Sequence, residues 1–197
     1  MEIKYNLTLL TIGQISMKRI STEISLKRMV WWAIMSASLV VGRILFAVVP
    51  NVQPVTAMII LISLWMSPLD GAVVAVLTIL LSNLLLGFGL WTIPQIVAYL
   101  AIVGITWLLA PILRSSDLFI GALFASVMGF FYGFFISLIQ APFLGISAFW
   151  AYYLGGIPFD TYHALGNLGF YVLLCLPFRR VVDLLGEKNT RKRFEND

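Results

Sequence analysis

Six apolar runs follow one another along the chain, separated by short polar or turn-forming breaks. They cover residues 29–49, 54–67, 71–90, 92–113, 118–140 and 160–178. Most of them approach the roughly 20 residues that a helix needs to cross the hydrocarbon core of a bilayer. The second run is short, so we expect it to be buried among its neighbours, tilted in a thinned bilayer or extended by its flanks. All six are predicted to be helices, because open strands cannot satisfy their backbone groups in lipid and no ten-residue alternation indicates a barrel.

Composition supports a membrane protein. Hydrophobic residues make up 60% of the 197 residues and charged residues only 11%, and the mean hydropathy is +0.96. A soluble domain usually carries roughly 25% charged residues, so the outer surface of this chain must face lipid. The predicted fold class is an all-α integral membrane protein, a bundle of six transmembrane helices.

The basic residues predict the orientation of this bundle. Arg114 lies between the fourth and fifth runs, and the other basic residues outside the runs lie near the two ends of the chain: Lys4, Lys18, Arg19, Lys27 and Arg28 before the first run, and Arg179, Arg180, Lys188, Arg191, Lys192 and Arg193 after the last. The connections 50–53, 87–91 and 141–159 contain no lysine or arginine. The positive-inside rule therefore places both termini in the cytoplasm and these three connections outside.

This topology divides the chain into three parts. They are an N-terminal cytoplasmic segment (1–28), a six-helix membrane domain (29–180) and a basic cytoplasmic tail (181–197). We assign no role to residues 1–16, because Met17 offers an alternative start.

Arg43 is the one basic residue that breaks the charge pattern. It lies seven residues before Pro50, which is roughly 10 Å from the outer end of its helix. An arginine at mid-membrane costs roughly 2.5–3.5 kcal/mol. It either snorkels to the outer surface or faces a cavity filled by water or ligand. We favour the cavity, because charges inside membranes usually mark such pathways.

The parts predicted to face outward carry amide and aromatic side chains. Trp91, Gln95 and Tyr99 recur every four residues, which places them on one stripe of a helix. Gly155 and Gly156 indicate a hinge in the long outer connection. A few polar groups in an apolar wall are typical of a ligand pocket, and amides and aromatics without paired charges favour a large ligand of mixed polarity over an ion. The predicted ligand-binding residues are Arg43, Asn51, Gln53, Asn83, Trp91, Gln95, Tyr99, Trp150, Tyr153, Tyr162, His163 and Asn167.

The sequence contains one histidine and one cysteine, and each has few possible roles. His163, the only histidine, either coordinates a metal or a metal-bearing ligand or makes hydrogen bonds, with Asp160 as a near partner; we favour hydrogen bonds. Cys175, the only cysteine, excludes an internal disulfide framework, and we expect a buried, inert thiol.

Small residues at four-residue spacing predict close contacts between helices. The fifth run carries such a stripe, and we expect it to pack inside the bundle: Gly121, Ala125, Gly129 and Gly133. The first run carries a shorter pair, Ala33 and Ala37. For this pair, packing inside the bundle and contact with a partner protein fit equally well.

Motifs of several function classes are absent from the sequence. It has no Gly-x-x-x-x-Gly-Lys-Ser/Thr phosphate loop and no His-Glu-x-x-His metal motif. Asp70 and Asp117 fall in predicted cytoplasmic turns and Asp160 at the outer edge, so no span holds the acid that a proton- or sodium-coupled carrier usually needs. Energy for uphill transport would therefore come from elsewhere.

An intramembrane serine protease is a competing class, because Ser147 and His163 both lie on the predicted outer side. Ala148 follows Ser147, however, whereas rhomboid-type proteases carry Gly-x-Ser-Gly. A self-sufficient secondary carrier is the other competing class. We predict no catalytic residue and no metal site.

Together these features resemble the substrate-capture (S) component of an energy-coupling factor (ECF) transporter, over about Leu26 to Leu185. The resemblance implies that Ala33 and Ala37 contact a transmembrane scaffold subunit. It also implies that two separate ATPase subunits use ATP, which would explain the missing phosphate loop. The S component is thought to topple in the membrane and carry its vitamin inward.

Within this family, "RILFAVVPNVQPVTA" and "LLGFGLWTIPQ" look most like the cobalamin-type S component. The likeness rests on Arg43, Pro50, Asn51, Pro54, Gly89, Trp91, Thr92 and Gln95. It implies that the chain captures cobalamin outside the cell and has no cofactor of its own. Pantothenate or another vitamin is compatible with the same resemblance.

Overall fold

The computed structural model describes residues 26–194, and the side chains of residues 26–184. The expectations for residues 1–25 and for the side chains of the basic tail beyond residue 184 lie outside this range. The chain divides into two compact units, residues 1–31 and 32–197. In the first unit, the described residues form the start of helix α2; everything below concerns the second unit.

Six helices make up the described chain. They are α2 (Leu26–Leu45), α3 (Val55–Trp65), α4 (Pro68–Leu86), α5 (Thr92–Ser115), α6 (Leu118–Phe143) and α7 (Phe149–Phe194). All except α3 contain a stretch that is long and apolar enough to cross a membrane. The predicted all-α membrane fold with six helices is confirmed. The orientation of the termini and the boundaries of the three parts stay predictions.

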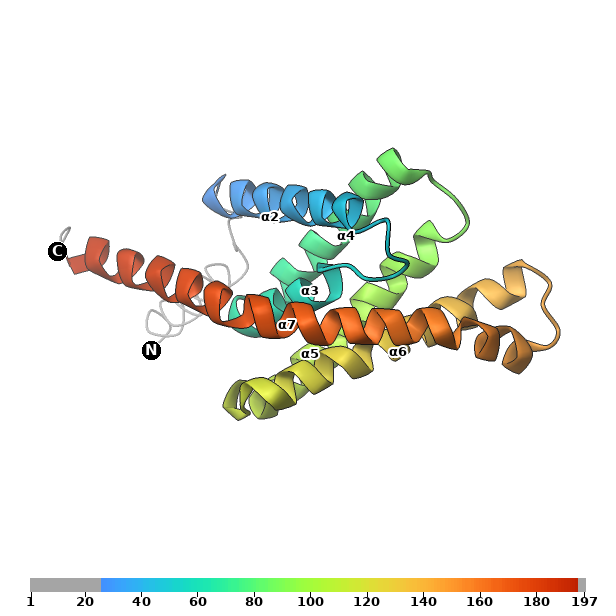
Figure 1. Cartoon of the computed structure of the whole chain (residues 1–197). Coiled ribbons are helices and arrows are strands. Elements are labelled where there is room, and N and C mark those ends of the chain that lie inside the picture. Colours follow the sequence, from blue (N-terminus) through green and yellow to red (C-terminus); the bar gives the residue numbers. More distant parts are fainter. Residues whose placement is uncertain (1–25, 195–197) are drawn as a thin grey trace, which may run out of the picture. The chain divides into compact units, whose positions relative to one another are not determined.

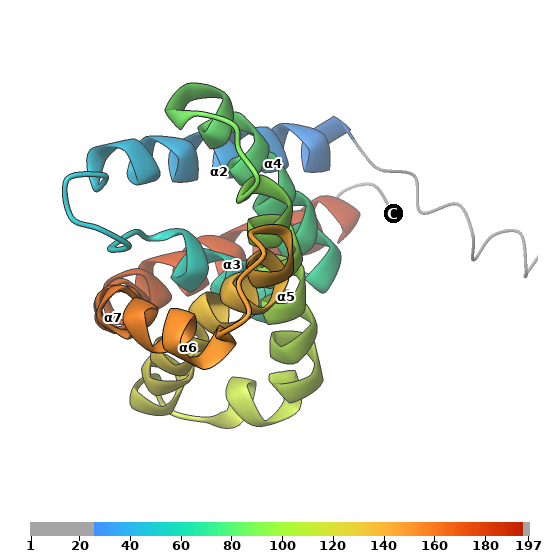
Figure 2. The same ribbon diagram turned by 90° about the vertical axis from the view of Figure 1, so that its right-hand side faces the viewer.

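Helix α3 is the core of the bundle. It packs against α4, α5, α6 and α7 (Figures 1 and 2), and nine of its eleven residues are buried. Of the three expectations for the short second run, burial among its neighbours is therefore the one that holds. The helix ends where Arg114 Nε donates to the carbonyl of Leu64 at 2.7 Å, because a cation there satisfies a terminal carbonyl and opposes the helix dipole.

Helices α6 and α7 pack closely because small residues of α6 face α7. A Cβ at Gly129 would lie 2.7 Å from the backbone of Ala164. One turn earlier, the carbonyl of Ala125 accepts a hydrogen bond from Asn167 Nδ2 at 3.2 Å. The stripe of small residues thus packs inside the bundle, as predicted.

The connection before α7 is shorter than predicted. The sequence indicated an external segment over 141–159, but α6 continues to Phe143 and α7 already begins at Phe149. Gly155 and Gly156 therefore lie inside a continuous helix, and the predicted hinge is wrong. Pro158 also lies inside α7, which membrane helices tolerate where their surroundings satisfy the freed backbone groups.

Long side chains join α2 to α4. Trp32 Nε1 donates to Asp70 Oδ1 at 2.7 Å, and the Ser67 hydroxyl caps α4 by accepting from the Asp70 amide at 3.1 Å. Asp70 is buried in the first turn of α4, whereas the sequence placed it in the turn before this helix. Asp117 does lie at a turn, where it caps α6.

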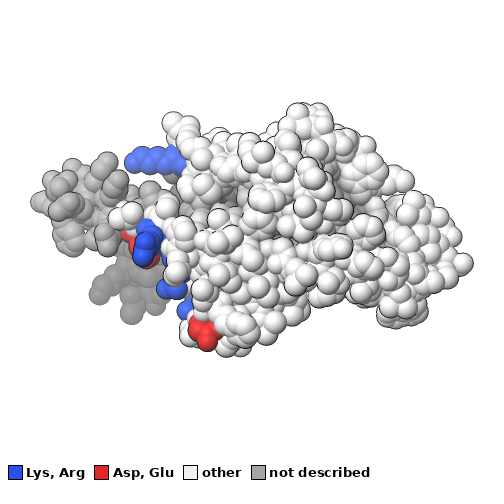
Figure 3. Space-filling model, in the orientation of Figure 1, with Lys and Arg blue, Asp and Glu red and all other residues white. Residues whose placement is uncertain are grey.

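Among the described side chains of residues 32–184, the exposed charges belong to the α5–α6 turn and to the last part of α7: Arg114, Asp117, Arg179, Arg180 and Asp183. Figure 3 shows charged side chains toward one end of the face drawn. The connections 87–91 and 144–148, toward the other end of the helices, carry no charged residue. This is the asymmetry from which the orientation was predicted.

Candidate functional site

Arg43 lies in the last turn of α2 and is 7% exposed. Its Nε donates to Gln53 Oε1 at 3.0 Å, and Nη1 donates to Ser82 Oγ at 2.5 Å. A longer bond of 3.4 Å joins Nη1 to Asn83 Oδ1. The guanidinium is therefore held inside the bundle, and the snorkelling interpretation is wrong.

Asn83 connects Arg43 to the start of α5. Its Nδ2 donates to Thr92 Oγ1 at 3.0 Å and to Gln95 Oε1 at 2.9 Å. The amide is 2% exposed and every polar atom of its side chain is bonded. This network fixes the positions of Arg43 and Gln95, because a buried polar group is held in place by all its partners at once.

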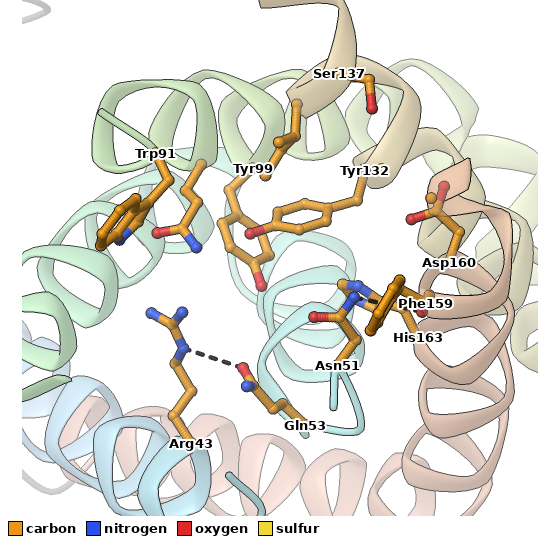
Figure 4. Close-up of a pocket in the computed structure, with 14 residues that line it drawn as sticks. Arg43, Asn51, Gln53, Trp91, Tyr99, Tyr132, Ser137, Phe159, Asp160 and His163 are labelled. Carbon is orange, nitrogen blue, oxygen red and sulfur yellow. Dashed lines mark hydrogen bonds between the residues drawn. The ribbon is translucent and has the colours of Figure 1, made fainter. Parts of the chain in front are cut away.

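A pocket of about 220 Å³ lies beside this network (Figure 4). Its polar lining consists of Arg43, Asn51, Gln53, Gln95, Ser137, Asp160 and His163. Its aromatic, aliphatic and glycine lining consists of Trp91, Tyr99, Tyr132, Gly133, Ile136, Gly156 and Phe159. The site therefore joins the end of α2 and the following connection to α5, α6 and α7, with an apolar wall and a few polar groups, as is usual for small-molecule sites.

Asp160 lies on the opposite side of the pocket from Arg43 (Figure 4). It was predicted at the outer edge of the last span, outside the membrane segments, but it lies within the candidate span Phe149–Leu184 of α7, and its side chain is 6% exposed. Gly133 of α6 makes room for it, because a Cβ at that position would collide with the Asp160 carboxylate. The close packing of α6 on α7 thus brings an acidic group into the pocket.

His163 lines the pocket and is held in place by contacts with its neighbours. Its Nε2 lies 2.8 Å from Thr56 Oγ1, and its ring packs against Tyr132 with 4.8 Å between centroids. Nδ1 is buried and has no hydrogen-bond partner among the described residues. The predicted bond to Asp160 is therefore wrong, and Thr56 is the partner. No group of three or more metal-ligating side chains occurs in the described part of the chain.

Residues 50–54, the segment "PNVQP", form a lip along α7. Asn51 has φ 60°, a conformation that asparagine tolerates better than most residues, and its Nδ2 donates to the Phe159 carbonyl at 3.4 Å. Val52 rests on α7 at Gly166, where a Cβ would lie 3.2 Å from it. The lip therefore contributes Asn51 and Gln53 to the pocket and ties its edge to α7 by one long hydrogen bond.

Comparison with known families decides the class of this site. The family described as "ECF transporter, substrate-specific component" matches residues 27–175. The chain belongs to this family. No curated protein and no solved structure matches it.

As an ECF S component, the chain is a multi-pass membrane subunit of a transporter and not an enzyme. S components pair with an ECF scaffold and ATPase subunits. The self-sufficient carrier is therefore not its class, and the protease alternative is wrong as well. Ser147 lies exposed in the connection 144–148, while His163 is bonded to Thr56, so the two do not form a dyad.

Seven of the twelve predicted binding residues line the pocket of the S component: Arg43, Asn51, Gln53, Trp91, Gln95, Tyr99 and His163. The other five lie elsewhere. Asn83 lies outside the pocket lining and accepts a hydrogen bond from Arg43, and Asn167 is fully buried where α7 packs on α6. Tyr153 packs on Phe134 and Phe149. Trp150 and Tyr162 are 66% and 50% exposed and belong to no part of the pocket lining.

Sequence reasoning missed the contributions of α6 and of the start of α7 to the lining, above all Tyr132 and Asp160. One signal was available, because the small-residue stripe marks the face of α6 that packs closely. Tyr132 adjoins Gly133, the last glycine of that stripe.

Proposed function

We propose that this S component captures a vitamin in the pocket between Arg43 and Asp160, and that the pocket opens to the outside of the cell. The observation that carries this proposal is a polar cavity built around a buried arginine in an apolar helical bundle. Such an arginine costs roughly 2.5–3.5 kcal/mol at mid-membrane, and a ligand site is the function that accounts for this cost.

The charge distribution supports the outward orientation. The exposed charges lie toward the α5–α6 turn, and the connections on the pocket side carry no charge, which matches the positive-inside rule with both termini cytoplasmic. Single-cysteine labelling of intact cells tests this in a Cys175→Ser background. A cysteine at Ser147 should react with an impermeant maleimide and one at Ser115 should not; the reverse pattern would invert the topology.

The delivery step depends on the partner subunits. We propose that the exposed face of α2 with Ala33 and Ala37 contacts the scaffold, because small residues let helices approach closely in lipid. The scaffold would in turn connect the S component to the ATPases, which use ATP. The S component would contribute binding and reorientation only.

Cobalamin is the first candidate ligand. It is proposed because the segments around Arg43 and Trp91 look like the cobalamin-type S component, and because the lip and α5 offer the amides of Asn51, Gln53 and Gln95 to a ligand that is itself rimmed with amides. The pocket of about 220 Å³ is smaller than the roughly 300–1,000 Å³ of most drug-sized sites. Cobalamin therefore requires the lip to move away from α7, and the long bond between Asn51 and Phe159 is a contact that can open.

Pantothenate is the second candidate, and the pocket volume is the observation that favours it. A ligand of this size needs no opening of the lip to be enclosed. Its carboxylate would face Arg43 and its hydroxyls would face Asp160.

Equilibrium binding to the detergent-purified S component tests the capture role. The panel consists of cobalamin, pantothenate, folate and riboflavin, and the control is a Trp150→Phe variant, which changes an exposed aromatic outside the pocket lining. Tight binding of one vitamin supports capture and identifies the ligand, and the control should bind equally well. Absence of binding to every vitamin on the panel would contradict the proposal.

A further inference from the structure

Two oppositely charged side chains face the pocket, and neither has a charged partner in the described part of the chain. Arg43 is 7% exposed and Asp160 is 6% exposed, so water cannot freely solvate either group. Both belong to the pocket lining. Buried charges in proteins are usually paired, so this arrangement requires an explanation.

The hydrogen bonds of Arg43 leave one end of its guanidinium available. All its acceptors are neutral: the amide oxygens of Gln53 and Asn83 and the hydroxyl of Ser82. Nε and Nη1 make these bonds, and Nη2 has no acceptor among the described residues. The bonds of Nε and Nη1 thus fix the guanidinium, and the N–H groups of Nη2 remain available to a further acceptor. A fixed guanidinium with spare donors is suited to a carboxylate or a phosphate, which match its geometry.

Arg43 and Asp160 do not neutralise each other. They lie at opposite ends of the pocket, with the ring pair of Tyr99 and Tyr132 between them (Figure 4). These two rings pack together with 4.8 Å between their centroids. The carboxylate of Asp160 makes no hydrogen bond within the part of the chain described, so a complementary ligand supplies a donor there.

We propose that the captured ligand carries an anionic group, a carboxylate or a phosphate, that pairs with Arg43, and a hydroxyl or amino group that donates to Asp160. This inference rests on the proposed capture function and specifies the chemistry of the ligand. The aromatic wall between the two charges covers the less polar middle of the ligand. Vitamins without an anionic group are rejected, because they would leave the guanidinium buried and unpaired.

Pairs of ligands that differ in the anionic group provide the test. Binding to the detergent-purified chain is measured for pantothenate against panthenol, in which an alcohol replaces the carboxylate. It is also measured for cobalamin against cobinamide, which lacks the phosphate-bearing nucleotide, and for uncharged riboflavin. We call the pair of which at least one member binds the responding pair. Its anionic member should bind at least about 30-fold more tightly than the member that lacks the anionic group. The pair that responds distinguishes a carboxylate from a phosphate.

Variants then assign the preference to a residue. Arg43→Gln should reduce the ratio between the two members of the pair to within a few fold, whereas Arg43→Lys, which keeps the charge, should retain a clear preference for the anion. Asp160→Asn should weaken both members and leave their ratio unchanged, because it acts at the other end of the ligand. Thermal unfolding of each variant shows whether it is folded. If Arg43→Gln does not fold, the inference is still tested by the ratio of affinities for the two members of a pair, measured in the wild type and in Arg43→Lys.

Three outcomes overturn the inference. Tightest binding of riboflavin would keep the capture role and remove the anionic group from the ligand. Equal binding of the two members of the responding pair, or an unchanged ratio in a folded Arg43→Gln variant, would also overturn it. If no probe binds, the capture role fails, and the inference fails with it.

Discussion

Gly129 and Gly133 belong to the same small-residue stripe of α6, but replacing each of them with alanine should have a different effect. At Gly129, a Cβ would lie 2.7 Å from the backbone of Ala164. At Gly133, it would collide with the end of a side chain, the Asp160 carboxylate. A backbone in a packed helix cannot move alone, but a carboxylate can rotate away. We therefore expect Gly129→Ala to loosen the contact between α6 and α7, and Gly133→Ala to displace Asp160 while keeping that contact.

The structure gives the size of the difference in stability. Ordinary van der Waals contact begins at 3.4 Å, so α6 and α7 must separate locally by about 0.7 Å to accept a methyl group at Gly129. Overpacking of this kind costs about 1–3 kcal/mol. Both variants gain the same helix propensity, up to about 1 kcal/mol for alanine over glycine. Their difference therefore isolates the steric cost, and Gly129→Ala should be the less stable by about 1–3 kcal/mol.

Thermal unfolding in detergent and ligand binding measure the two effects separately. By the scaling of soluble domains of this size, each kcal/mol lowers the midpoint by roughly 2–4 °C. Gly133→Ala should have a midpoint equal to or slightly above that of the wild type, but it should bind ligand about 10- to 100-fold more weakly, because a hydrogen bond to a charged group is worth about 1.5–3 kcal/mol. Equal midpoints for the two variants would refute the assigned register of α6 against α7.

Three further predictions concern the lip, the joint between α2 and α4, and the partner surface. Asn51→Gly keeps a residue that adopts positive φ but removes the bond to Phe159, so ligand dissociation, followed by stopped-flow tryptophan fluorescence, should be about 2- to 10-fold faster. Trp32→Phe removes the indole donor from Asp70 and should lower the free energy of unfolding by about 1–3 kcal/mol, measured by denaturation in detergent. Ala33→Leu should leave vitamin binding unchanged and reduce co-purification with the scaffold and ATPases, because a bulky side chain prevents close approach of two helices.

Matched controls separate these effects from general damage. Trp150→Phe changes an exposed tryptophan and should not destabilise the protein as Trp32→Phe does. Ser38→Leu enlarges an exposed residue of α2 that lies roughly 100° around the helix from Ala37, and it should leave the complex intact. Unchanged dissociation in Asn51→Gly would remove the lip from the entry path, and an intact complex in Ala33→Leu would remove this face of α2 from the scaffold contact.

Hydrophobicity alone was sufficient to predict the helices, because each must match either the bilayer or the buried core. The short run at α3 was also recognisable, but its length left burial, tilting and extension open, and the structure shows that it is buried. The segment before α7 was misjudged because Gly155, Gly156 and Pro158 usually interrupt helices in water. In a packed membrane bundle the neighbouring groups satisfy the freed backbone, and the helix continues.

The pocket was predictable where its residues follow one another along a helix or a loop. Trp91, Gln95 and Tyr99 share one stripe at the start of α5, and Asn51 and Gln53 lie close together in the short connection after the first run. Contributions from α6 were not predictable, because they depend on how α6 packs on α7. Asn167 illustrates the limit: it lies one turn after His163 in sequence, yet the α6 backbone covers it completely.

The two walls of the pocket differ in how firmly they are held. On one side, α6 and α7 form a wall, and their backbones approach so closely at Gly129 that a methyl group there would force them apart. On the other side, the lip is tied to α7 by a single long hydrogen bond and by the contact of Val52 with Gly166. This wall fixes the backbone positions of Asp160 and His163, while the loosely held lip would allow a ligand to enter from the end whose connections carry no charges. Arg43 belongs to the rigid part, since Ser82 and Asn83 hold it from α4. Arg43 would therefore stay in place, held from α4, even where movement of the neutral lip breaks its bond to Gln53.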